Sequence, residues 1–323
     1  MAKKHRERTA LPHFILNPAA SAGKTGRIQA SLLLAIEEKF PGGFVLDVTT
    51  NQGHATEITR QALNAGTNLV VAVGGDGTIN EVVNGFLDKE KHVNAHARLG
   101  FLCIGTAKDV ARNLNLPDNL STQLDIVAGN LSRMIDLGKV SFHSRDGNQL
   151  DRFFINDCQP GIAAMVVRRV TPALKRLGGF LAFGIGSTLT ALTYRARYMS
   201  VSADGTDWIS GRFLGVTAAN GRYAGGGMDF APASRVDDGL LDLLVIKDQS
   251  VASRLINFPK IYTGKHIDLS WIEHRKAKKI RISSPEHVAL EADGELIGFL
   301  PCEISVVPRF LRVAAPDDSM KKI

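Results

Sequence analysis

The sequence predicts two domains of different fold class: an N-terminal open α/β domain with a parallel sheet, and a C-terminal β-sandwich domain with a helical insertion. The chain has 323 residues, which at roughly 150 residues per domain suggests two domains. In the first 140 residues, strand and helix patterns alternate, as in parallel α/β sheets. From residue 153 onward, strand patterns follow one another without regular intervening helices, which is typical of antiparallel sandwiches.

The N-terminal domain shows four strand patterns and four helix patterns. The run at 69–73 is continuously apolar, which is typical of a strand buried on both faces. The other predicted strands are 13–16, 44–49 and 99–104, and the predicted helices are 27–39, 55–65, 79–87 and one that begins at 109.

The C-terminal domain contains six strand patterns, one helical insertion over 162–197 and a last strand over 310–313. The six strands are predicted at 153–158, 213–219, 240–246, 279–282, 288–291 and 302–307. We therefore expect an α/β domain over 10–138, with the segment 309–323 as a candidate addition, and a β-sandwich domain over 139–308.

Composition narrows the class of protein. The net charge of +7 favours an anionic partner, which could be a nucleotide, a nucleic acid or an acidic membrane. Nucleic acid is not expected, because no recognised binding module is present and only 7% of residues are aromatic. The three cysteines have no metal-site or disulfide spacing, which favours a reducing cytoplasm. The uncharged stretch 177–194 contains many Gly, Ser and Thr residues, which favours a buried or lipid-lining helix over a membrane span.

A glycine-rich turn follows the buried strand at 69–73 and opens a helix. Its sequence is Gly74-Gly75-Asp76-Gly77-Thr78. Glycines at such a turn let a phosphate approach the backbone N–H groups at the helix N-terminus. The segment is neither a Walker A loop nor the spaced dinucleotide fingerprint. It therefore predicts a phosphate site at the carboxyl end of the strand, with a plain strand-to-helix turn as the alternative.

The segment 73–85, VGGDGTINEVVNG, resembles the nucleotide-binding signature of the diacylglycerol kinase catalytic-domain family, which includes soluble bacterial lipid kinases and the sphingosine and ceramide kinases. Its GGDG core is shared with NAD kinases and resembles phosphofructokinases, whereas NEVVNG resembles lipid kinases. Six further segments, two before this one and four after it, also occur in the family's order, so the resemblance covers about residues 14–313. They are 17–24, 49–55, 105–112, 220–232, 237–242 and 293–295.

The resemblance implies an ATP site in the first domain. Lys24 could supply charge to a phosphate or be a solvated lysine. Asp76 could act through magnesium or order the turn, and Asp109 could join a network around the nucleotide or begin a helix. Lys108 and Ser21 depart from the family's usual Asn and Gly. The implied ATP-binding residues are Asn17, Pro18, Ser21, Lys24, Thr49, Gly74, Gly75, Asp76, Gly77, Thr78, Asn80, Glu81, Thr106 and Asp109.

The resemblance also implies a catalytic turn and a structural magnesium site in the second domain. Asp293 would be the base that takes the proton of the acceptor hydroxyl, and Glu295 could share or take that role. Asp238 and the carbonyl groups of Arg235 and Leu240 would hold the ion. For both segments a plain hairpin turn is the alternative.

These features predict a lipid kinase that uses ATP and Mg2+ to phosphorylate the primary hydroxyl of a diacylglycerol-like or related lipid. The insertion at 162–197 combines apolar residues with a basic margin, which suits docking at an anionic membrane surface or an ordinary core helix. A cytoplasmic, peripherally membrane-associated protein is expected, with a homodimer as a candidate state. The alternatives are a kinase for a soluble acceptor such as NAD, and a regulatory nucleotide-binding protein without transfer activity.

Overall fold

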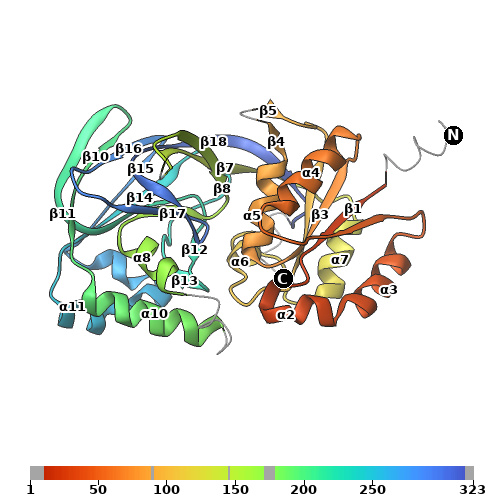
Figure 1. Ribbon diagram of the computed structural model, residues 1–323, viewed down its shortest axis with the longest axis horizontal. Coiled ribbons are helices and arrows are strands. Elements are labelled where there is room, and N and C mark those ends of the chain that lie inside the picture. Colours follow the sequence, from red (N-terminus) through yellow and green to blue (C-terminus); the bar gives the residue numbers. More distant parts are fainter. Residues whose placement is uncertain (1–10, 89–90, 145, 171–178, 317–323) are drawn as a thin grey trace. The chain divides into compact units, whose positions relative to one another are not determined.

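The computed structural model describes residues 11–88, 91–144, 146–170 and 179–316. These residues form two compact units, which divide at Ile135/Asp136 and again at Arg309/Phe310. The first unit therefore contains both the N-terminal part of the chain and the segment after Arg309. The chain passes from one unit to the other within strand β7 (Arg133–His143) and again within strand β18 (Glu295–Val313) (Figure 1).

The first unit is built on a parallel sheet in the order β2-β1-β3-β6, and Val313 at the end of β18 pairs in parallel with Leu99 of β6. Every residue of β3 is buried, as its apolar run predicts. The strands are β1 (His13–Leu16), β2 (Val45–Val48), β3 (Leu69–Gly74) and β6 (Arg98–Cys103), with a hairpin of β4 (Leu87–Asp88) and β5 (Lys91–His92).

Helices cover both faces of this sheet. Side chains of α3 and α7 pack with Phe14 and Leu16 on one face, while α4 and α5 pack against each other and against β1 and β3. Ile15, whose side chain alternates to the other face, is also fully buried. The helices are α2 (Ala20–Arg27), α3 (Gln29–Lys39), α4 (His54–Asn64), α5 (Asp76–Gly85), α6 (Asp109–Asn113) and α7 (Leu120–Ala128).

Three helices of this unit differ from the sequence prediction. Helix α5 begins at Asp76 rather than near residue 79, because β3 continues to Gly74 and the single extended residue Gly75 forms the turn. Part of the expected phosphate loop at 17–24 belongs to helix α2. Helix α7 was not predicted, although Asn119 is its N-cap and accepts hydrogen bonds from the N–H groups of residues 121 and 122.

The second unit is a β-sandwich. One layer runs antiparallel in the order β15-β14-β11-β10-β16-β18, and β9 and β17 join it through β11 and β18. Apolar side chains from these strands and from β7 and β8 form one core. The strands are β8 (Gln149–Phe154), β9 (Asp157–Pro160), β10 (Arg197–Ala203), β11 (Thr206–Ala219), β14 (Leu241–Lys247), β15 (Ile272–Ala277), β16 (Lys279–Ser283) and β17 (Ala289–Ala292), with a hairpin of β12 (Tyr223–Ala224) and β13 (Met228–Asp229).

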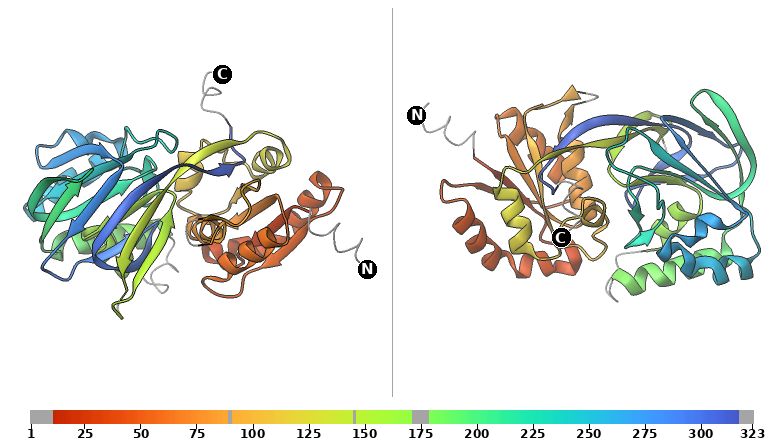
Figure 2. Two further views of the ribbon diagram at one scale, coloured as in Figure 1. Left: turned by 90° about the horizontal axis from the view of Figure 1, so that it is seen from above. Right: turned by 180° about the vertical axis from the view of Figure 1, so that it is seen from behind.

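The helices of this unit gather on one side of its strands (Figures 1 and 2). The predicted insertion at 162–197 contains two helices, and residues 171–178 within it lie outside the described part of the chain. Among the described helices, none combines the length and apolar character that crossing a bilayer requires. The helices are α8 (Ile162–Arg169), α10 (Gly179–Thr193) and α11 (Val251–Asn257), followed by the 3-10 helices η1 (Phe258–Thr263) and η2 (Lys265–Asp268).

Candidate functional site

The glycine turn between β3 and α5 is shaped by close backbone approach. A Cβ atom at Gly74 would lie 2.6 Å from Oγ1 of Thr78, and one at Gly105 would lie 2.8 Å from Cα of Gly75. The β3–α5 and β6–α6 turns therefore touch at positions that only glycine fits. The N-terminus of the ten-residue helix α5 lies at this turn, where backbone N–H groups and the helix dipole suit a phosphate.

Asp76 holds the neighbouring turn in place. Its Oδ1 accepts a hydrogen bond of 3.0 Å from the backbone N–H of Val110, at the start of α6. Burial raises the pKa of Asp76, and the N–H groups of Val110 and Asp109 act in the opposite direction. Of the two roles expected for this carboxyl group, ordering of the turn is the one that its contacts describe.

Polar residues that follow β1 and β6 lie at the same turn. Asn17 donates through Nδ2 to Oγ1 of Thr78 at 2.9 Å and accepts from the N–H of Ala19 at 3.0 Å. Ser21 Oγ lies 3.4 Å from Thr106 Oγ1. Residues that follow β1, β3 and β6 thus meet at the carboxyl edge of the parallel sheet, where ligands of open α/β sheets bind.

Three other residues that were predicted to bind ATP differ in their contacts and exposure. Pro18 accepts a hydrogen bond from the N–H of Gly26 at 3.2 Å. Thr49 is buried, and its N–H donates to the carbonyl of Leu16 at 2.8 Å. Lys24 lies exposed in the last turn of α2. Pro18 and Thr49 therefore have backbone roles, whereas Lys24 remains a surface cation.

The Asn-Glu-Val-Val-Asn-Gly part of the motif joins α5 to α4. Glu81 accepts from the N–H of Ala55 at 3.2 Å, close to the N-terminus of α4, and Asn80 is fully buried. A Cβ atom at Gly85 would lie 2.4 Å from Cβ of Thr59. Asn80, Glu81 and Gly85 therefore have structural roles in this part of the fold.

Lys108, which stands where the family usually has Asn, has an unusual backbone conformation. Lys108 has a φ of +55°, a left-handed conformation that Asn adopts more readily than Lys. Its Nζ lies 2.8 Å from Oδ1 of Asp118. The neighbouring Asp109 is buried and pairs with Arg112 at 3.2 Å. The lysine therefore adopts this left-handed conformation and directs its charge to a surface carboxylate.

In the second unit, Asp293 and Gly294 form the two-residue turn between β17 and β18, both with positive φ. The carboxylate of Asp293 accepts three backbone hydrogen bonds: Oδ2 from Ile155 at 2.8 Å, and Oδ1 from Asn156 at 2.8 Å and Asp157 at 3.2 Å. The segment is thus a hairpin turn that also carries the two predicted catalytic carboxyl groups.

Glu295 lies at the start of β18, directly after this turn. Its Oε2 pairs with Nη2 of Arg152 at 2.5 Å. Both side chains are largely shielded from solvent. The guanidinium therefore fixes the position of the second predicted catalytic carboxylate.

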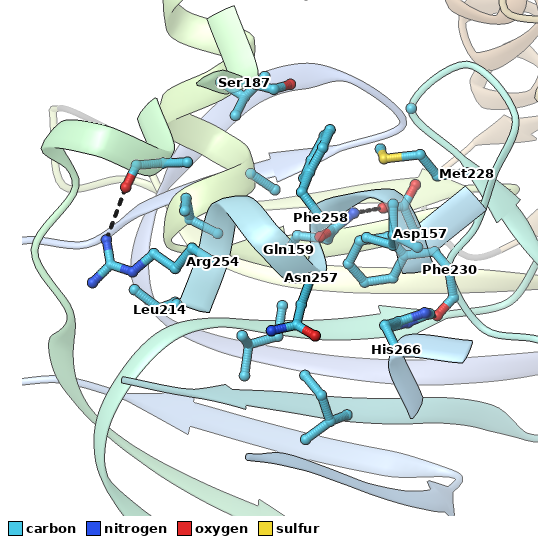
Figure 3. A pocket seen from close by; sticks show the side chains of 18 of the residues that line it. Asp157, Gln159, Ser187, Leu214, Met228, Phe230, Arg254, Asn257, Phe258 and His266 are labelled. Atoms are coloured by element: carbon cyan, nitrogen blue, oxygen red, sulfur yellow. Dashed lines mark hydrogen bonds between the residues drawn. The ribbon is translucent and has the colours of Figure 1, made fainter. Parts of the chain in front are cut away.

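A mostly apolar cavity of about 190 Å³ lies in the second unit (Figure 3). Helices α8, α10 and α11 and the strands beneath them supply its walls. Gly294, the central residue of the Asp-Gly-Glu turn, belongs to the lining. The main apolar contributors are Val166, Leu214, Met228, Phe230, Phe258 and Trp271.

The sequence analysis assigned none of the polar residues of the cavity wall to a site, which are Asp157, Gln159, Ser187, Arg254, Asn257, His266 and Glu291. Asp157 and Gln159 are two apart on β9, and Glu291 is two before Asp293, so the two-residue period of a strand could have indicated a shared face. His266 lies in a 3-10 helix that the sequence did not predict. Antiparallel pairing of Glu291 with Gln159 brings these strands together.

A lysine ammonium group contacts the carboxylates of the segment that was predicted to bind magnesium. Lys276 Nζ lies 2.7 Å from Asp238 Oδ2 and 3.2 Å from Asp242 Oδ2, and Asp238 Oδ1 accepts from the N–H of Leu240. Burial opposes the charge, but the hydrogen bond to Asp238 and the charge of Asp242 raise the pKa of Lys276. Arg235 contacts Asp237 at 3.3 Å.

These contacts do not fit an ion bound by Asp238. The ammonium group already neutralises the carboxylates that would attract Mg2+. We therefore derive no step through an ion at Arg235, Asp238 and Leu240.

The fold and these sites define the class of protein: a chain with the architecture shared by NAD kinases and diacylglycerol kinases. It aligns over 97% of its length with 97% of an NAD kinase from Archaeoglobus fulgidus in complex with ATP (13% identity, TM-score 0.54). It aligns over 95% of its length with 97% of a diacylglycerol kinase from Bacillus anthracis (22% identity, TM-score 0.69).

The family follows from the sequence matches. Residues 12–140 match the diacylglycerol kinase catalytic domain, and residues 157–315 match the YegS C-terminal NAD kinase beta sandwich-like domain. A diacylglycerol kinase of Bacillus subtilis is 29% identical over 276 residues, which cover 85% of this chain and 86% of that protein. The chain belongs to the diacylglycerol kinase catalytic-domain family and is a lipid kinase by that membership.

Proposed function

We propose that this protein transfers the γ-phosphate of ATP, with Mg2+, to the primary hydroxyl of a diacylglycerol-like lipid. The observation that carries the proposal is the place of Gly294. This residue separates the two carboxyl groups expected to act as base, and it lines an apolar cavity in the same unit. An apolar cavity beside a candidate base suits a lipid alcohol better than a soluble acceptor.

The nucleotide half of the proposal rests on the first unit. The N–H groups at the start of α5 and the hydroxyls of Thr78, Ser21 and Thr106 would bind the phosphates, and Lys24 would add positive charge. Mg2+ bound with the ATP phosphates would neutralise the charge that develops during transfer. The neighbour from Archaeoglobus fulgidus, which is in complex with ATP, supports ATP as the nucleotide.

In the transfer step, the acceptor oxygen forms a bond to the γ-phosphorus while the bond between that phosphorus and the oxygen of ADP breaks. The proton of the acceptor hydroxyl passes to Asp293, or to Glu295. Asp293 accepts three N–H groups, so its carboxylate is firmly positioned. Positioning is what phosphoryl transfer mainly requires, together with charge neutralisation.

Exposed apolar side chains support a peripheral membrane association in the cytoplasm. Ile185, Leu189 and Leu192 project at intervals of four and three residues from α10, and each is about half exposed. Leu255 and Ile256 on the neighbouring α11 are also exposed. We propose that these five residues enter the lipid interface when the protein collects its substrate.

The first test is transfer of labelled γ-phosphate from ATP and Mg2+ to lipid alcohols in mixed micelles, followed by organic extraction, with NAD offered in a parallel reaction. We expect label in the lipid phase. Label in NAD and none in any lipid would refute the lipid acceptor and favour the soluble one. ATP binding without label in either product would favour the regulatory alternative.

A further inference from the structure

Lys108 has a backbone conformation that lysine adopts only at a cost. Its φ of +55° lies in the left-handed region, which Asn enters more readily than Lys because its short polar side chain can hydrogen-bond locally. Strained backbone of this kind tends to occur at binding and catalytic sites, where the side chain is used. The conformation therefore points to a function of the Lys108 side chain.

The residues on both sides of Lys108 contact the turns that would hold the phosphates of ATP. Before it, Thr106 Oγ1 lies 3.4 Å from Ser21 Oγ, in the segment that follows β1. After it, the N–H of Val110 donates to Oδ1 of Asp76 at 3.0 Å, at the start of α5. Lys108 stands between these two contacts, so its backbone lies beside the candidate phosphate site.

The charge of Lys108 acts at the carboxyl edge of the parallel sheet. Cys103 ends β6 and is buried. Burial raises the pKa of its thiol, the charge of Asp76 raises it further, and the charge of Lys108 lowers it. The charges of Asp76 and Lys108 thus reach the same buried thiol, which places the ammonium group near the edge where α5 begins.

In the structure the ammonium group pairs with a solvated carboxylate. Nζ of Lys108 lies 2.8 Å from Oδ1 of Asp118, whose side chain is 90% exposed. An ion pair with such a partner contributes little to stability, so it does not account for the strained backbone. The same exposure lets Asp118 release the lysine at little cost, because water then solvates the carboxylate.

We propose that Lys108 is a phosphate-binding cation of this chain, and that its ammonium group moves from Asp118 to the phosphates when ATP binds. Asp118 is then a counter-ion that holds the lysine until a nucleotide arrives. The phosphates of ATP carry several negative charges whereas Asp118 carries one, so the exchange favours the nucleotide. The inference rests on the proposed function, because it takes the turn at the start of α5 as the phosphate site.

The proposal predicts effects of opposite sign for the two partners of the ion pair. Lys108→Asn removes the ammonium group, and Asn suits the left-handed conformation, so the turn keeps its shape. ATP affinity should fall by about fivefold or more in this variant. Asp118→Asn removes the competing carboxylate, so ATP affinity should rise by about threefold or more. A purely structural ion pair would give no such opposition.

A double variant separates release of the lysine from the general effect of removing a negative charge. If the released ammonium group binds phosphate, Asp118→Asn improves ATP affinity only while Lys108 is present. In the Lys108→Asn background, the same substitution should change ATP affinity by less than about 1.5-fold, because salt screens a charge that is 90% exposed.

Affinities are measured by calorimetry with ATP and Mg2+, and by competition with adenosine, which has no phosphate. Adenosine affinity should be unchanged in every variant. Lys108→Arg keeps the positive charge, so its ATP affinity should stay within about threefold of wild type. Lys39→Asn is the matched control. Lys39 also pairs with an exposed carboxylate, that of Asp125, but it ends α3 shortly before β2 begins and so lies near the amino edge of the sheet.

The outcomes separate this inference from the proposed function. Equal ATP affinity of wild type and Lys108→Asn, or an Asp118→Asn effect that persists without Lys108, would overturn the inference and leave the lipid kinase intact. An equal loss of adenosine and ATP affinity in Lys108→Asn would also overturn it, because the lysine would then support the site as a whole. Opposite effects of the two single variants, without phosphate transfer to any lipid, would support the inference and refute the proposed reaction. A wild type that binds no ATP would overturn both.

Discussion

Asp293→Asn tests whether one carboxylate both anchors the β17–β18 turn and accepts the proton. In the structure its two oxygens receive three backbone N–H groups, one at Oδ2 and two at Oδ1. An amide can keep at most the two bonds at one oxygen, and its NH2 group would then face the N–H of Ile155. One hydrogen bond to a charged group is lost and one buried donor is left unpaired.

The expected loss of stability follows from the one hydrogen bond that is lost. A hydrogen bond to a charged group contributes about 1.5–3 kcal/mol, so the second unit should be destabilised by about that amount. Removing a positioned base typically slows a reaction by about 10²–10⁴-fold. Asp293→Asn should therefore show both a lower urea midpoint and a transfer rate at least about 100-fold below wild type.

Two assays and one control separate the roles. The midpoint of urea unfolding measures how much the hydrogen bonds of Asp293 stabilise the turn. The single-turnover rate of phosphate transfer at saturating ATP measures its contribution as a base. Glu295→Gln breaks the largely shielded ion pair with Arg152 but leaves the three N–H bonds to Asp293 in place, so it is the comparison variant for the anchoring role. Near wild-type transfer by Asp293→Asn would refute the base assignment, and an unchanged urea midpoint would refute the anchoring argument.

Three further predictions concern other sites. Gly105→Ala places Cβ 2.8 Å from Cα of Gly75, so calorimetry should show ATP binding weakened at least tenfold, whereas Gly184→Ala, whose Cβ meets open space, should not change it. Without nucleotide, Mg2+ should not change the thermal midpoint of the wild type, whereas Lys276→Met should lower the midpoint and Mg2+ should partly restore it; a Mg2+-dependent wild type would contradict the internal-cation argument. Glu291 has a raised pKa in the folded state, so its stabilising contribution is full below its ordinary value of 4.5 and decreases as pH rises. The stability advantage of Glu291→Gln, measured by urea unfolding, should therefore grow as pH rises above about 5, by up to about 1.4 kcal/mol per pH unit, and an advantage independent of pH would count against it.

Much of the first unit could be predicted because its signals are local. The apolar run of β3 and the glycines that follow it predict a buried strand and a phosphate turn without reference to the rest of the chain. The helices missed or shortened were those whose starts depend on caps and turns, such as α2 and α7. Short strands such as β4 and β5 have too few residues to show a period.

The sequence by itself determined the fold class, because the period and spacing of apolar residues are properties of neighbouring residues, and its resemblance to a known family indicated the order of the motifs and the carboxyl groups of the Asp-Gly-Glu turn. Tertiary structure alone decided which of these groups meet. Asp157 and Glu291 are 134 positions apart, yet antiparallel pairing of their strands brings them to one cavity wall. Pairing of β14 with β15 likewise brings Lys276 beside Asp242, and burial, which depends on the whole fold, raises the pKa of Glu291.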